Sequence, residues 1–131
     1  MITGGCQCGE VRYEVDSATD RHALCHCADC RASAGAPAVA WMAVAENEFR
    51  VTKGSARAYN SSGKSMRYFC PNCGTGLYFT NDEMLPGIVD VQSATLDDPE
   101  AHQPQVQIQC AERLGYMTGL EEMPTFERWP G

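Results

Sequence analysis

Seven of the eight cysteines in this 131-residue chain fall in three short clusters. The first is a C-x-C pair at residues 6–8, the second a C-x-C-x-x-C run at 25–30, and the third a C-x-x-C pair at 70–73, while Cys110 stands alone. The N-terminal sequence shows no basic segment followed by an apolar stretch, so we expect no secretory signal and a cytoplasmic location. Because disulfides rarely persist in a reducing compartment, cysteines this dense indicate metal binding or thiol chemistry.

Charge and composition exclude several classes of protein. The formal net charge is −7, and no dense run of lysine and arginine offers the basic face that a nucleic-acid duplex requires. No apolar run approaches the roughly 20 residues needed to cross a bilayer. The length suits one domain over residues 1–131, and the balance of 44% apolar and 21% charged residues is that of an ordinary globular protein.

Short segments with alternating apolar and polar residues predict a β-rich fold. The clearest is at residues 11–15, where Val11, Tyr13 and Val15 alternate with charged residues. We predict further strands at 38–44, 49–51, 66–70, 77–79, 88–91 and 106–110, and short helices at 28–33 and 97–101. The strands at 66–70 and 77–79 flank the third cysteine cluster as a hairpin would, and Pro86-Gly87 indicates a turn.

The first and third clusters together supply four thiolates, which is the number that a structural zinc ion takes. We predict a structural zinc site made of Cys6, Cys8, Cys70 and Cys73. Neighbouring glycines allow backbone N–H groups to approach these sulfurs. Such a site would tie the N-terminus to the middle of the chain, so that metal-binding energy becomes folding energy. Reduced core thiols or a disulfide are the alternatives.

The middle cluster supplies only three thiolates, Cys25, Cys27 and Cys30. Three protein ligands and one free position are typical of a catalytic zinc site, and a thiol bound to zinc loses its proton near neutral pH. Two alternatives stay open: a second structural zinc completed by His26 or an aspartate, and a redox dithiol at Cys27 and Cys30.

The remaining cysteine and the histidine and tryptophan residues discussed next are not expected to take part in function. We expect Cys110 in the core, His22 and His102 on the surface, and both tryptophans, Trp41 and Trp129, in packing contacts.

Three motifs with their flanking glycines resemble the glutathione-dependent formaldehyde-activating enzyme family, which also contains the centromere protein V domain. They are GGCQCGEVRY at 4–13, CHCADCRASAGAP at 25–37 and FCPNCGT at 69–75. Residues 96–99 and 123–126 are similar to the later pattern of the family. Many relatives carry a His-Ile pair where this chain has Gln107-Ile108.

The resemblance implies a mainly β fold of the β-tent type, with several small antiparallel sheets around zinc. It implies two Zn²⁺ ions per chain: a structural one on the four-cysteine set and a catalytic one on Cys25, Cys27 and Cys30. The implied activity is that of a carbon–sulfur lyase that adds glutathione to formaldehyde, with a small thiol and a small aldehyde as partners. Because glutathione is an anion, we predict that Arg31 binds it, with Lys64 and Arg67 as further candidate cations. The alternative is a non-catalytic module that zinc merely stabilises.

Overall fold

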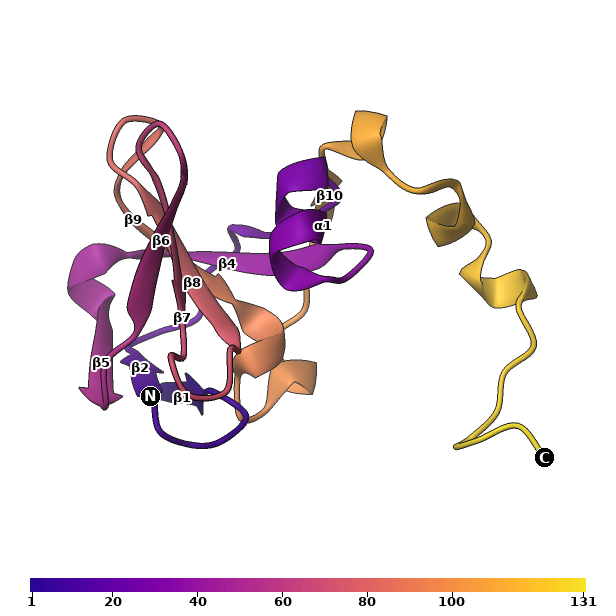
Figure 1. Ribbon diagram of the computed structural model, residues 1–131, viewed down its shortest axis with the longest axis horizontal. Coiled ribbons are helices and arrows are strands. Elements are labelled where there is room, and N and C mark those ends of the chain that lie inside the picture. The colour runs from indigo at the N-terminus through magenta and orange to yellow at the C-terminus, as the bar shows by residue number, and fades with distance from the viewer.

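Two β-sheets form the body of the protein, whose computed structural model describes residues 1–131 (Figure 1). The smaller sheet has three antiparallel strands in the order β1-β2-β5, and the larger has seven in the order β10-β3-β4-β9-β8-β7-β6. The small-sheet strands are β1 (Ile2–Gly5), β2 (Arg12–Val15) and β5 (Phe49–Lys53). The large-sheet strands are β3 (His22–Cys25), β4 (Val39–Ala45), β6 (Arg57–Ser62), β7 (Ser65–Phe69), β8 (Gly76–Asn81), β9 (Leu85–Gln92) and β10 (Val106–Ile108).

The predicted mainly β class is confirmed, and neighbouring strands pair antiparallel throughout except β10, which pairs parallel to β3. The one α-helix, α1 (Ala28–Ala34), follows β3 directly. Six 3₁₀ turns complete the elements: η1 (Glu46–Glu48), η2 (Ser93–Thr95), η3 (Pro99–Ala101), η4 (Cys110–Glu112), η5 (Gly115–Thr118) and η6 (Leu120–Glu122). None of these helices has the length and apolar character that spanning a membrane requires.

The main core lies between the two sheets. Val11, Tyr13 and Val15 point into it from β2 and its approach, as their alternation predicts, and they meet Met42 of β4 and Leu77 of β8. Removing this apolar surface from water is the main favourable term in folding. The core therefore holds the loop before β2 against the turn that joins β7 to β8.

Several predicted elements are confirmed. The strand at 38–44 is β4, the helix at 28–33 is α1, and β7 and β8 form an antiparallel hairpin around the third cysteine cluster. The helix predicted at 97–101 is only the short turn η3. Three strands, β1, β3 and β6, lack an alternating apolar pattern and were not predicted.

The turn predicted at Pro86-Gly87 is wrong, because both residues lie within β9. The actual turn precedes them and is organised by Asn81, whose buried side-chain oxygen accepts hydrogen bonds from the backbone N–H groups of Glu83 and Met84 at 3.0 and 2.9 Å. A side chain that bonds the backbone two and three residues on supplies the turn without proline or glycine.

Three expectations about single residues are wrong, while Trp41 is buried as expected. His22 is 2% exposed, and its Nε2 lies 2.6 Å from the hydroxyl of Ser93, which satisfies the buried ring. Cys110 is exposed rather than in the core, because β10 ends at Ile108 and the chain then leaves the sheet. Trp129 is 87% exposed.

The last part of the chain forms an arm, defined here as residues 109–131. Figure 1 shows this segment, in yellow and orange, running from β10 past α1 and away from both sheets. The arm contains the short turns η4, η5 and η6 and no strand.

Candidate metal centres

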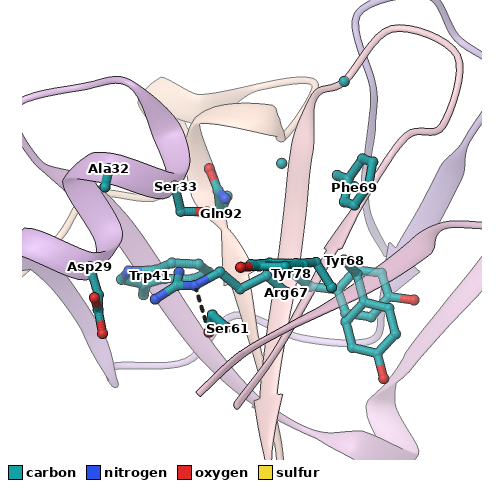
Figure 2. Close-up of a pocket in the computed structure, with 13 residues that line it drawn as sticks. Asp29, Ala32, Ser33, Trp41, Ser61, Arg67, Tyr68, Phe69, Tyr78 and Gln92 are labelled. Carbon is teal, nitrogen blue, oxygen red and sulfur yellow. Dashed lines mark hydrogen bonds between the residues drawn. The ribbon is translucent and has the colours of Figure 1, made fainter.

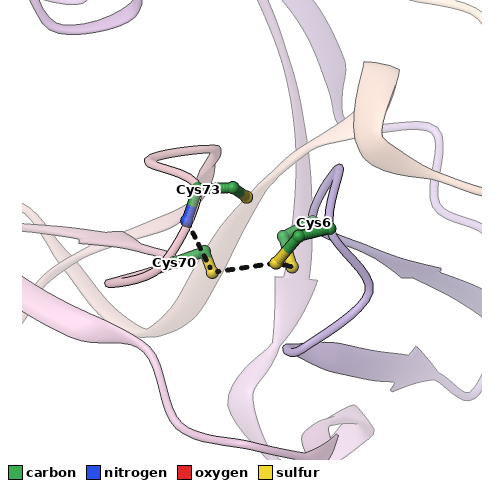
Figure 3. Close-up of side chains that lie close together, drawn as sticks. Cys6, Cys70 and Cys73 are labelled. Atoms are coloured by element: carbon green, nitrogen blue, oxygen red, sulfur yellow. Dashed lines mark hydrogen bonds between the residues drawn. The ribbon is translucent and has the colours of Figure 1, made fainter.

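Two loops bring the four cysteines of the first predicted site together. Cys6 and Cys8 lie between β1 and β2, and Cys70 and Cys73 lie between β7 and β8. Figure 3 shows Cys6 facing Cys70 and Cys73. All four Sγ atoms lie within 4.8 Å of one another. The site therefore joins a loop of the small sheet to a turn of the large sheet.

The spacing of the sulfurs fits a tetrahedral zinc ion. The Sγ atoms of Cys6 and Cys8 are 3.6 Å apart, and those of Cys8 and Cys70 are 3.8 Å apart. A tetrahedron with Zn–S bonds of about 2.3 Å has edges of about 3.8 Å. A disulfide would need sulfurs about 2 Å apart, and all eight cysteines are free. A set of four cysteine sulfurs is one of the donor sets that structural zinc takes.

Polar groups surround the four sulfurs and stabilise negative charge on them. The backbone N–H groups of Val11 and Cys73 donate to Cys6 and Cys70 at 3.2 and 3.5 Å, and the side-chain amide of Asn72 donates to Cys8 at 3.3 Å. Such outer contacts orient the ligands and spread the charge of a thiolate site.

Thr75 acts on the fourth sulfur in the same way. Its hydroxyl lies 3.2 Å from Sγ of Cys73, and this hydrogen bond, together with backbone N–H groups, lowers the pKa of Cys73 to about 5. The local environment therefore favours the thiolate of Cys73, and the thiolate is the form that binds metal.

The second predicted site lies at the junction of β3 and α1. Cys25 ends β3, Cys27 caps the N-terminus of α1, and Cys30 is in its first turn. The capping contact is a hydrogen bond of 3.3 Å from the backbone N–H of Cys30 to Sγ of Cys27. The helix therefore folds the C-x-x-C half of the motif so that both sulfurs face the end of β3.

Three sulfurs, and no fourth protein donor, make up this group. The Sγ atoms of Cys25, Cys27 and Cys30 lie within 4.8 Å of one another, and no histidine nitrogen or carboxylate oxygen joins them at that separation. Burial raises the pKa of Cys25 to about 12 and also raises the pKa of Cys30. Desolvation opposes ionisation of Cys27, but hydrogen bonds from Cys30 and Cys25 outweigh it and lower the pKa of Cys27. The group therefore favours one thiolate, and ionising all three close sulfurs requires a cation among them.

His26 lies between two of these cysteines but turns away from them. Its ring is 1% exposed, and Nε2 lies 2.8 Å from the side-chain oxygen of Gln107 on β10. Nδ1 is buried without a hydrogen-bond partner. Because Gln107 accepts through its oxygen, Nε2 is the donor in this arrangement. The alternation of apolar residues and glutamines in β10 does not predict this contact between His26 and Gln107.

Arg67 of β7 is the cation in contact with the three-cysteine group. Its two terminal nitrogens lie 3.9 and 4.0 Å from Sγ of Cys30, and Nε donates to the hydroxyl of Ser61 at 3.2 Å. The guanidinium carbon also lies 5.2 Å from the ring centroid of Phe79. These contacts hold a positive charge beside a candidate thiolate ligand.

Arg31 occupies a different surface of α1. It lines a shallow cavity of about 450 Å³ between α1 and the arm, together with Leu114 and Tyr116. Its Nε is buried without a hydrogen-bond partner. One donor of Arg31 is therefore unpaired within the chain.

A larger pocket of about 510 Å³ opens between α1 and strands β6 to β8. Figure 2 shows Asp29 on one side of it and Phe69 on the other, with Trp41, Arg67 and Tyr78 between them. Gly74 of the four-cysteine turn also lines it, so the pocket extends from one cysteine group toward the other. An apolar lining with a few convergent polar groups is typical of small-molecule sites.

Comparison with known proteins agrees with this architecture. A curated protein of Schizosaccharomyces pombe, named an uncharacterized lyase, is 33% identical over 81 residues, which is 58% of this chain and 55% of that protein. This chain therefore spans about half the length of that relative. A crystal structure of a Rhodobacter sphaeroides protein has the same fold, with a TM-score of 0.64 and 23% identity over 80% of this chain and 98% of that one.

The fold and the two sulfur groups define a mainly β protein with two candidate zinc centres. The sequence profile of the glutathione-dependent formaldehyde-activating enzyme family matches residues 1–112. The chain belongs to this family, and the resemblance seen in its motifs is confirmed.

Proposed function

We propose that this protein is a zinc-dependent lyase that joins a small thiol, such as glutathione, to a small aldehyde, such as formaldehyde. Family membership and the lyase name of the yeast relative support the reaction class. The observation that carries the proposal is the group of three cysteine sulfurs without a fourth protein donor. A closed structural zinc site would have four.

The reaction is an addition. A bond forms between the thiol sulfur and the carbonyl carbon, the π bond of the carbonyl breaks, and the thiol proton ends on the carbonyl oxygen. Zinc held by Cys25, Cys27 and Cys30 would lower the pKa of a coordinated thiol and so supply a thiolate nucleophile near neutral pH.

The chain's own residues divide the remaining tasks. Cys6, Cys8, Cys70 and Cys73 would hold a second, structural zinc, which gives two Zn²⁺ per chain. Arg67 holds a positive charge beside Cys30 and lines the large pocket, where it can meet an anionic thiol. Arg31 stays our proposed carboxylate contact on the opposite side of α1, where its Nε has no partner. The two arginines thus provide local positive charge in a protein of net charge −7.

A cytoplasmic location fits the proposal, because in a reducing compartment the cysteines stay out of disulfides and can bind zinc. The large pocket, at about 510 Å³, has room for the body of a small thiol.

Cobalt substitution tests the open position directly. Co²⁺ replaces Zn²⁺ in thiolate sites, and its visible absorption reports the ligands. We expect glutathione to change the spectrum saturably in the wild-type protein, whereas S-methylglutathione, which lacks the thiol, should not change it. The Cys27→Ser variant, which keeps only the four-cysteine site, is the matched control and should not respond. An unchanged wild-type spectrum would favour the non-catalytic, zinc-stabilised module.

A further inference from the structure

The arm concentrates apolar surface that the rest of the chain leaves uncovered. Tyr116, Leu120, Met123, Phe126 and Trp129 are between 45% and 87% exposed. Beyond Glu112, every hydrogen bond of the arm joins two residues of the arm, as in the bonds from Met117 N to Leu114 O and from Gly119 N to Tyr116 O. Exposed apolar residues gathered on one segment mark an interaction site.

A hydrogen bond holds the first part of the arm against α1, and the rest of the arm extends away from the two sheets. The carboxylate of Glu112 accepts a hydrogen bond of 3.1 Å from the backbone N–H of Ala28 at the start of α1. From there Figure 1 shows the chain extending away from both sheets to the C-terminus. The apolar residues near the end of the arm therefore lie beyond the reach of their own body in this conformation.

The strand just before the arm is also uncovered. β10 is an edge strand of the large sheet, and its Val106 and Ile108 are 57% and 43% exposed. A groove of about 500 Å³ lies between this edge and the arm, where Val106 faces Met117 and Leu120. Exposed apolar edge strands are normally paired or covered.

We propose that two copies of this chain form a symmetric dimer by exchanging arms, each arm packing along the β10 edge of the other copy. A two-fold arrangement needs one self-complementary surface, and this chain carries both halves of it, an apolar arm and an apolar edge, side by side. The proposal is independent of the chemistry at the metal centres.

The surface area that two exchanged arms would bury matches what a stable dimer needs. Three of the five arm residues are aromatic, and aromatic side chains bury about 150–250 Å² each. Covering the exposed parts of all five residues therefore removes roughly 500 Å² per arm. The surface that receives each arm loses a similar area. Two arms therefore give about 2,000 Å² in total, at the upper end of the range for standard protein–protein interfaces.

Sedimentation equilibrium of the zinc-loaded chain measures the association. We expect a dimer. We expect the double variant Phe126→Ser/Trp129→Ser to raise the dissociation constant of this dimer at least 100-fold. Met84→Ser, which removes a 77% exposed apolar side chain from the turn between β8 and β9, is the matched control and should dimerise like the wild type. A monomeric wild type, or a double variant that dimerises normally, would overturn the proposal.

Tryptophan fluorescence then distinguishes exchange from an arm that folds back. The chain has two tryptophans, so Trp41→Phe leaves Trp129 as the only reporter. Exchange predicts blue-shifted emission at high protein concentration that shifts to the red as dilution dissociates the dimer. Emission that stays blue where sedimentation shows a monomer means an arm packed on its own body, and emission that is red at every concentration means a solvated arm. Either result contradicts the proposal.

Discussion

The Sγ atoms of Cys8 and Cys70 lie 3.8 Å apart, although 62 positions separate these residues in the chain. Cys8 belongs to a loop of the small sheet and Cys70 to a turn of the large sheet. A zinc ion at this point would cross-link the two sheets beside their shared core. The three-cysteine group, in contrast, lies within residues 25–30 and cross-links nothing distant.

The two sites should therefore respond differently to loss of one ligand. Apparent binding free energies of structural zinc are about 10–16 kcal/mol, comparable to or larger than the stability of a typical domain. We expect Cys73→Ser to unfold the protein or to lower its melting temperature by tens of degrees. We expect Cys27→Ser to lose one zinc per chain and all lyase activity while keeping the fold.

Circular dichroism and zinc analysis on the same samples check this prediction. Cys110→Ser is the control, because Cys110 is exposed and belongs to neither group. It should keep both ions, the wild-type melting temperature and full activity. Equal loss of structure in the Cys27→Ser and Cys73→Ser proteins would show that the two sites do not differ in role.

Arg67 should affect substrate binding through its charge. Replacing it with methionine keeps much of the packing on Phe79 but removes the cation beside Cys30, so we expect kcat/KM for glutathione to fall at least tenfold. Arg67→Lys should recover part of this loss. Arg57→Met, on the exposed strand β6, is the matched control. Unchanged kinetics in Arg67→Met, with zinc content intact, would remove Arg67 from the site.

Asp90 should make stability depend on pH. Burial raises its pKa from 3.8 to about 6, a shift that the charge of Arg21 reduces only in part. A raised carboxyl pKa destabilises the folded state most strongly above pH 6. This penalty becomes small as the pH falls toward 4, where the group is protonated in the folded state and about half protonated in the unfolded state. We expect Asp90→Asn to stabilise the protein by about 1–2 kcal/mol at pH 7.5 and to have little effect at pH 4.

Chemical denaturation at the two pH values measures the difference. The control is Asp82→Asn, because Asp82 is exposed in the adjoining turn. A gain in stability for Asp90→Asn that is the same at pH 4 and pH 7.5 would refute the electrostatic explanation.

The sequence predicted the strands whose apolar residues alternate, such as β2, and the hairpin around the third cysteine cluster. It also divided the cysteines into the two groups that the structure brings together, because thiol spacing within a short loop limits where the sulfurs can point. Strands β1, β3 and β6 were missed, since they pack through glycine, histidine or exposed polar residues rather than through an apolar stripe.

Contacts between distant segments could not be predicted from local patterns. Arg67 reaches Cys30 across 37 positions, and Gln107 reaches His26 across 81. Both depend on the order of strands in the large sheet, which the spacing of apolar residues does not encode. The exposure of Cys110 and Trp129 could not be predicted for the same reason. A local apolar pattern does not show where the chain departs from the two sheets.

Zinc content per chain tests directly whether the protein has two metal sites. The protein should be produced with ample zinc under reducing conditions, and both metal and protein should be quantified in the same sample. Two sulfur groups predict two zinc ions per wild-type chain and one in Cys27→Ser. One ion per wild-type chain, held equally by the Cys27→Ser variant, would show that the three-cysteine group binds no metal and would contradict the proposed reaction.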